Sequence, residues 1–118
     1  MIRRMIPGFA TLLLVLAGPA WAADAAKGKA VTQVKCVGCH GEGGTGNGVM
    51  LQMLNVTTPP VPWTDKTRMA AFSDADLTKI ITSGGAAVGK PPIMPAFKSQ
   101  LSDAQIADVI AYIRSLAQ

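Results

Sequence analysis

The sequence predicts an all-α domain with about three main helices joined by long loops. Two segments begin with a Ser-x-x-Asp or Ser-x-x-Gln box followed by apolar residues at helical spacing, the pattern of a capped amphipathic helix. No stretch of useful length alternates apolar and polar residues as a half-buried strand would. Glycine- and proline-rich stretches separate the helical segments and indicate loops.

The first helix is expected to begin near Asp24, which is a good N-cap, and to run through residues 25–35 into residues 36–40. Its apolar face is thin and consists chiefly of Val31 and Val34. Gly28 costs about 1 kcal/mol in a helix interior. A close approach of another backbone would justify this glycine, and a merely tolerated glycine is the alternative.

The second and third helices share one start signal. Ser73 with Asp76, and Ser102 with Gln105, form capping boxes in which side chains satisfy the free backbone groups of the first turn. Gly84-Gly85 ends the second helix. The third helix carries the longer apolar stripe, which predicts packing in the core: Ile106, Val109, Ile110, Ile113 and Leu116.

The N-terminus has the pattern of a secretory signal peptide. Arg3 and Arg4 precede an apolar run over residues 6–17, and Ala20-Trp21-Ala22 forms a small-residue cleavage site. We place the cut after Ala22, which leaves residues 23–118 as one domain. An uncleaved membrane anchor is the alternative, but prolines at both ends of the run shorten the continuous helix. Either outcome places the domain outside the cytoplasm, so we expect a periplasmic protein.

Removal of the signal peptide changes the composition. The loss of Arg3 and Arg4 lowers the net charge from +4 to +2. So small a positive charge does not indicate a nucleic-acid-binding protein. A chain this short, with few large side chains, fills a core with difficulty. The composition therefore favours a cofactor at the centre. The aromatic residues of the remaining chain are Trp63, Phe72, Phe97 and Tyr112.

Residues 36–40 read Cys-Val-Gly-Cys-His, the run typical of covalent c-type haem attachment. On one helical turn Cys36, Cys39 and His40 share a face, so two thiols could bond to the haem edge while the imidazole binds iron. A zinc site needs about four ligands, and these are the only cysteines and the only histidine. We expect one covalent haem c bound by these three residues. The alternatives are a thiol redox pair, which would need a βαβ context, and a disulfide, which would leave His40 unexplained.

The second axial position decides what the iron can do. His40 is the only histidine, so a second histidine ligand is excluded within the chain. Met94 lies in a segment with prolines on both sides, which fix φ and stiffen the chain. The known His/Met mode of ligation makes His40 and Met94 the expected metal ligands. Met50 and Met53 are the alternative ligands, although packing or a loop position explains them more simply.

The chain resembles the class I c-type cytochromes, in particular the small bacterial monohaem type. The resemblance covers essentially all of residues 23–118, and the haem motif combined with the Met-Pro segment is specific. It implies a small cytochrome c fold packed around one haem, with the first and last helices crossing at Gly28 and Tyr112. Thr32 departs from the family, which often has an aromatic residue there. The matching residues are Lys27-Gly28-Lys29, Cys36 to Gly41, Ser73 to Ile81, Gly84-Gly85, Met94 to Phe97, Leu101 to Asp103 and Tyr112 to Leu116.

The resemblance also implies that a proline carbonyl accepts a hydrogen bond from the second nitrogen of the ligating imidazole. Pro59, Pro60 and Pro62 are all candidates for that carbonyl, and the sequence does not choose among them.

Ligation by His40 and Met94 leaves iron no vacant position, so we expect a periplasmic electron carrier and not an enzyme. The reaction is one-electron Fe(III)/Fe(II) shuttling between redox protein partners by a monomer with no membrane anchor after cleavage. One alternative is a cytochrome subunit of a larger oxidoreductase, and another is a haem sensor or enzyme with an open iron. Surface cations could steer an acidic partner, with scattered solubilising charge as the alternative: Lys35, Lys66, Arg68, Lys90 and Lys98.

Overall fold

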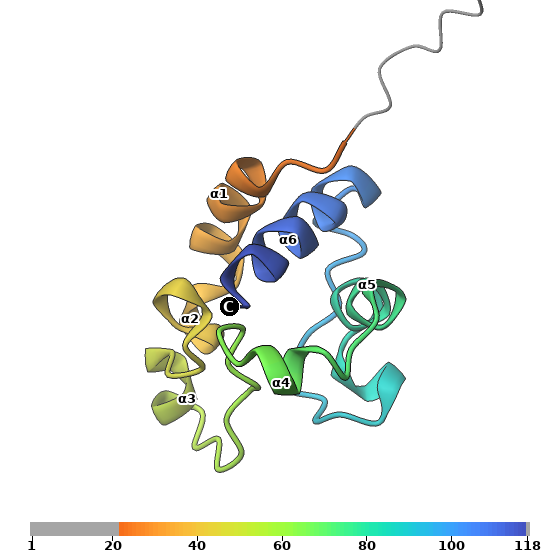
Figure 1. Cartoon of the computed structure of the whole chain (residues 1–118). Coiled ribbons are helices and arrows are strands. Elements are labelled where there is room, and N and C mark those ends of the chain that lie inside the picture. The colour runs from red at the N-terminus through yellow and green to blue at the C-terminus, as the bar shows by residue number, and fades with distance from the viewer. Residues whose placement is uncertain (1–21, 118) are drawn as a thin grey trace, which may run out of the picture.

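The computed structural model describes residues 22–117, which form an all-α domain (Figure 1). The predicted signal peptide, residues 1–22, lies outside this range except for Ala22. Three helices have seven or more residues, as the sequence predicts, and no strand occurs within the described range. The elements are α1 (Ala25–Lys35), α2 (Val37–His40), the 3-10 turn η1 (Glu42–Gly44), α3 (Val49–Met53), α4 (Lys66–Met69), α5 (Asp74–Ser83), the 3-10 turn η2 (Gly85–Val88) and α6 (Asp103–Leu116).

Helix α1 begins where the sequence predicts, but it ends at Lys35 and does not continue into the motif, because Cys36 leaves helical geometry. The Asp24 carboxylate accepts hydrogen bonds from the backbone N–H groups of residues 26 and 27. The predicted apolar face is partly wrong, because Val34 is 78% exposed while Gly28 and Thr32 are buried. Val31 packs against the core, as expected. The helix therefore presents a face of small side chains to its partner.

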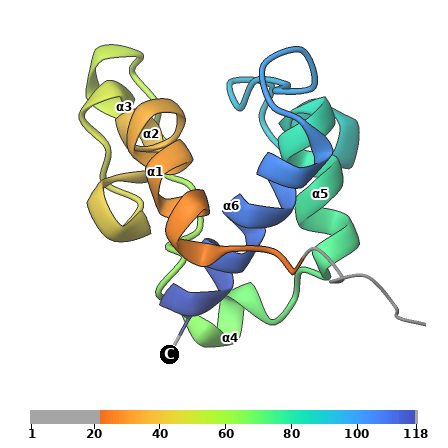
Figure 2. The same ribbon diagram turned by 90° about the horizontal axis from the view of Figure 1, so that it is seen from above.

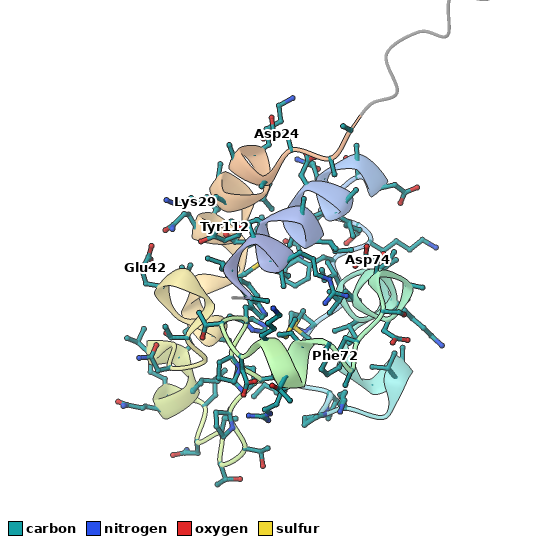
Figure 3. All side chains as sticks on the ribbon, in the orientation of Figure 1. Asp24, Lys29, Glu42, Phe72, Asp74 and Tyr112 are labelled. Atoms are coloured by element: carbon teal, nitrogen blue, oxygen red, sulfur yellow. The ribbon has the colours of Figure 1, made fainter. Side chains whose placement is uncertain are left out.

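Helices α1 and α6 cross in close contact, and Gly28 lies at the crossing. A Cβ atom at Gly28 would lie 1.9 Å from the carbonyl oxygen of Asp108, so the close approach of another backbone, and not mere tolerance, accounts for this glycine. Thr32 is only 1% exposed, and its hydroxyl donates a hydrogen bond to the Lys29 carbonyl at 2.8 Å. A small, hydrogen-bonded polar side chain is therefore buried where the family often has an aromatic residue. Tyr112 is buried where α6 faces α1 (Figure 3).

The two predicted capping boxes are present. Ser73 and Ser102 each accept from the backbone N–H three residues on, and the side chains of Asp76 and Gln105 accept in return from the two serine N–H groups. Gly84 ends α5 with φ of +84°, in the region that favours glycine. Both long helices therefore start and stop by local chemistry.

The chain between α1 and α5 contains more helix than expected. Sequence patterns predict an irregular stretch there, yet it includes α3 and α4. Both are too short to display helical periodicity, which becomes recognisable only over 11 or more residues. Asp65 caps α4 by accepting from the N–H of Arg68 at 3.0 Å.

The buried core draws on both ends of the chain. In Figures 1 and 2, helices α1 and α6 form a base. The α2–α3 arm extends from it on one side and the α5 arm, which comprises α5, η2 and the loop up to α6, on the other, with α4 between the two arms. Within the described range, no helix is long and apolar enough to cross a membrane. The buried apolar cluster consists of Trp63, Met69, Leu77, Ile81, Phe97, Leu101, Ile106, Val109, Ile110, Tyr112 and Ile113.

Arg114, near the end of α6, joins that helix to the segment between α4 and α5. Its guanidinium donates to the carbonyls of Met69 and Phe72 and to the carboxylate of Asp74, the last at 2.9 Å. Figure 3 labels Phe72 and Asp74 close to α5. These bonds hold α4 and the start of α5 against the end of α6.

Candidate functional site

The Cys-x-x-Cys-His motif forms the turn that begins at the end of α1. Cys36 leaves helical geometry with φ of −122° and ψ of −30°, and the chain resumes as α2. The Cys36 carbonyl accepts from the N–H groups of Cys39 and His40 at 3.3 and 2.9 Å. The motif therefore occupies one helical turn, as the spacing predicts. Both cysteines are half-buried free thiols, so no disulfide joins them.

His40 stacks on Trp63, which lies in the proline-rich segment before α4. The ring centroids are 4.6 Å apart and the planes meet at 24°. Burial lowers the pKa of the imidazole to about 4, which keeps it neutral at physiological pH. A neutral imidazole is the form that binds a metal ion. Sequence reasoning did not single out Trp63, and its only signal was a large aromatic in a chain that has few.

The Nδ1 atom of His40 is buried and has no hydrogen-bond partner among the described residues. The proline carbonyl bond implied by the family resemblance is therefore absent in this structure. The Pro60 carbonyl lies instead against Gly46, 2.9 Å from the place a Cβ would occupy. Indole stacking, and not a carbonyl bond, is the contact that orients the ring here.

The glycine-rich stretch after the motif wraps closely around it. Gly46 and Gly48 donate their N–H groups to the carbonyls of His40 and Cys39, at 2.7 and 3.1 Å. A Cβ at Gly44 would lie 2.4 Å from the Trp63 ring. The stretch therefore serves as a close-packed loop that holds the indole against the imidazole.

Met94 approaches from the opposite arm of the molecule. Its side chain is half-buried and packs against the buried cluster, as does Cys36. Its carbonyl accepts from the N–H of Gly85 at 3.0 Å, which fixes the segment to the end of α5. His40 and Met94 lie near each other, in agreement with His/Met ligation.

The other methionines have different surroundings. Met53 is 77% exposed on α3, and Met69 is buried in the core. Met50 is 42% exposed and places its Sδ 2.7 Å from the Cβ position of Gly38, between the two cysteines in sequence. Unlike these three side chains, Met94 is half-buried against the cluster and lies outside the α2–α3 arm.

The thiol and metal alternatives lose support from the same geometry. Burial, reinforced by the charge of Cys39, raises the pKa of the Cys36 thiol to about 11, whereas a reactive redox cysteine has a lowered pKa. Among residues 22–117 no group of three or more His, Cys, Asp and Glu side chains could hold a metal ion. Neither zinc binding nor thiol exchange is supported by these observations on the motif.

The family model for cytochrome c matches residues 25–117. The chain belongs to the cytochrome c family. It is a class I cytochrome c domain with small monohaem cytochromes among its homologues. Members of this family are typically electron carriers rather than enzymes.

This cytochrome is similar in sequence to the two relatives named below and in fold to one solved structure. Cytochrome c6 of Picosynechococcus sp. is 34% identical over 106 residues, which cover 85% of this chain and 80% of that protein. The Cbb3-type cytochrome c oxidase subunit FixP of Bradyrhizobium diazoefficiens is 36% identical over 93 residues, 79% of this chain but only 28% of that subunit. The structure of the KustC0563 c-type cytochrome matches with a TM-score of 0.60 at 22% identity, covering 77% of this chain and 98% of that one.

The residues present fit one covalent haem c, which the domain and its single cysteine pair imply. Cys36 and Cys39 are the attachment residues. The shared packing of Cys36 and Met94 on one apolar cluster matches the apolar surroundings that a haem needs. The chemistry supplied by the group when bound is exchange of one electron between Fe(III) and Fe(II).

Proposed function

We propose that this cytochrome is a periplasmic one-electron carrier in which His40 and Met94 are the two axial ligands of haem c. The main support is the convergence of the site on one apolar cluster. Cys36 and Met94 pack against that cluster from opposite arms, and His40 stacks on Trp63, which belongs to it. Family membership independently supports electron transport.

The protein's own residues perform three tasks in this function. His40 stays neutral because burial lowers its pKa, so its imidazole needs no deprotonation before it binds iron. The Met94 thioether favours the ferrous state and raises the potential. Leu77 and Ile81 exclude water from the centre, which disfavours the additional charge of the ferric state.

Replacement of Met94 by Ala tests the ligation, and Met53→Ala is the matched control because Met53 is an exposed methionine on α3. The ferric M94A holoprotein should lose the red charge-transfer band of thioether-ligated haem, and its ferrous form should bind carbon monoxide. The M53A protein should behave as wild type. Unchanged spectra in M94A would contradict the proposal and would favour the open-iron sensor or enzyme.

The periplasmic location and the domain boundaries rest on the N-terminal sequence pattern. Intact mass of the holoprotein isolated from the native cell, together with cell fractionation, tests both. A chain that starts at Ala23 in the periplasmic fraction is the expected result. Retention of residues 1–22 in the membrane fraction would show that the segment is an anchor.

A subunit role in a larger oxidoreductase is the second candidate, favoured by exposed apolar side chains on and just after α3 and in the loop before Met94. Contiguous exposed apolar surface marks interaction sites. The two FixP proteins and CcoP that match this chain are named as oxidase subunits, of which it spans only 28–29%. The exposed side chains are Val49, Met50, Met53, Leu54 and Ile93.

Native electrophoresis of a gently solubilised whole-cell extract, with the haem detected in the gel, separates the two candidates. A carrier migrates at the mass of its own domain, whereas a subunit migrates with a larger complex. All five predicted surface cations are exposed in the structure. If the redox partners are acidic, salt screens their attraction to these cations, and the rate of electron exchange should fall as the salt concentration rises.

A further inference from the structure

The loop that carries Met94 is closed at both ends by the backbone of one residue, Gly85. The Gly85 N–H donates to the Met94 carbonyl at 3.0 Å, and the Gly85 carbonyl accepts from the Lys90 N–H at 2.9 Å. Two further bonds, from Phe97 to Ile81 at 2.9 Å and from Lys98 to Thr82 at 3.2 Å, continue the attachment to the end of α5. The segment after η2 therefore follows α5 closely (Figure 1).

This attachment leaves no room for a side chain at Gly85. A Cβ there would lie 2.4 Å from the Pro91 carbonyl oxygen and 3.2 Å from the Met94 Cβ. The first contact is with backbone and is far shorter than any ordinary Cβ contact, so the loop would have to move. Unlike Gly84 and Gly89, Gly85 has no positive φ. Close approach, and not backbone conformation, is what this position requires.

Apart from the close packing of its backbone against Gly85, the loop has few contacts that could hold Met94 in place. Lys90 places its ammonium 5.5 Å from the centre of the Phe72 ring, a cation–π contact that holds only one side of the loop. Most of the loop side chains are exposed, whereas Met94 is half-buried. The thioether therefore reaches the apolar cluster from a loop whose position is set chiefly by backbone bonds, two of them to Gly85 and two to the end of α5.

We propose that Gly85 is a positioning residue for the axial methionine, acting through the backbone of the loop and not through any contact with iron. This inference rests on the proposed His40/Met94 ligation. A side chain at position 85 displaces the Pro91–Met94 segment and raises the population of protein in which Met94 is dissociated. A shift of that population by about tenfold corresponds to about 1.4 kcal/mol.

The test compares the G85A and G89A holoproteins with wild type. Gly89 lies in the same loop with φ of +72° and nothing within 4 Å of its Cβ position, so G89A strains the backbone without moving Met94. The readouts are the thioether charge-transfer band, carbon monoxide affinity of the ferrous protein, midpoint potential and unfolding free energy. G85A should lose much of the band, bind carbon monoxide at least about tenfold more tightly and have a lower potential. G89A should lose only stability.

The outcomes separate this inference from the function on which it rests. Absence of the band in wild type would refute His40/Met94 ligation itself. A band, affinity and potential in G85A equal to those of wild type, with stability alone reduced, would overturn the role of Gly85 while leaving the ligation intact.

If G85A yields no folded holoprotein, G84A against G89A makes the same comparison. Both glycines have positive φ, but only a Cβ at Gly84 would approach the Met94 carbonyl, at 3.0 Å. G84A should weaken the band and G89A should not, and equal bands in the two would overturn the inference.

Discussion

Substitution of Gly28 by Ala tests the helix crossing that supports both arms of the site. The added Cβ would lie 1.9 Å from the carbonyl oxygen and 2.4 Å from the carbonyl carbon of Asp108. Because both atoms belong to the backbone of α6, no rotamer change relieves the overlap, and the two helices must separate. The Asp24 N–H bond to the Asp108 carboxylate, at 2.7 Å, lies beside the same contact and would be stretched.

Two opposing effects set the magnitude. Ala stabilises a helix interior by about 1 kcal/mol relative to Gly, whereas overpacking of a well-packed interface costs about 1–3 kcal/mol or more. The backbone overlap places Gly28 at the upper end of that range, so the overpacking term wins. We expect G28A to lower the free energy of unfolding by about 2 kcal/mol, which in a domain of this size lowers Tm by roughly 8–16 °C.

Denaturant and thermal unfolding of the holoprotein, followed by circular dichroism, measure the effect. Val34→Ala is the control on the same helix, because Val34 is 78% exposed and surface substitutions usually change stability by less than about 0.5 kcal/mol. Equal or greater stability of G28A than wild type would refute the tight crossing and leave Gly28 a tolerated glycine.

Three further predictions concern the contacts around the site. Arg114→Lys should lower the unfolding free energy by about 1.5–3 kcal/mol because it breaks charge-assisted bonds to two backbone carbonyls. Asp74→Asn should lower it by less than about 1 kcal/mol because the salt bridge of Asp74 is exposed. Similar losses for the two variants in denaturant titrations would contradict this ranking. Backbone and side-chain hydrogen bonds from Ser73 lower the pKa of Asp76, so its stabilisation is full above the unfolded pKa and is lost as pH falls through the folded value; stability measured against pH should show a shallower acid-side decline in Asp76→Asn. Trp63→Leu should change the electron paramagnetic resonance g-values that report the orientation of the His40 ring while Trp63→Phe retains them, and equal spectra in all three proteins would show that the indole does not orient the imidazole.

The sequence predicted those parts of the fold that local chemistry determines. Both Ser-initiated capping boxes, the Asp24 cap and the glycine stop after α5 form as predicted, because each depends on groups within a few residues. The face of α1 was predicted less well, since Val34 points to solvent and Thr32 to the core. Which side of a helix is buried depends on its partner, and the partner of α1 is α6, distant in sequence.

The site shows the same division. The spacing of Cys36, Cys39 and His40 specifies one helical turn, and the structure contains it. The stack of Trp63 on His40 joins residues separated by a loop without periodicity, so no pattern predicted it. The stack takes the place of the proline carbonyl implied by the family resemblance, and Nδ1 finds no partner within residues 22–117.

Closure of the iron by His40 and Met94 is the central claim, and carbon monoxide binding to the reduced wild-type holoprotein tests it most directly. The account predicts a ferric spectrum with the thioether charge-transfer band and a ferrous spectrum unchanged by carbon monoxide. A ferrous protein that binds carbon monoxide stoichiometrically, from a ferric form without that band, would contradict it.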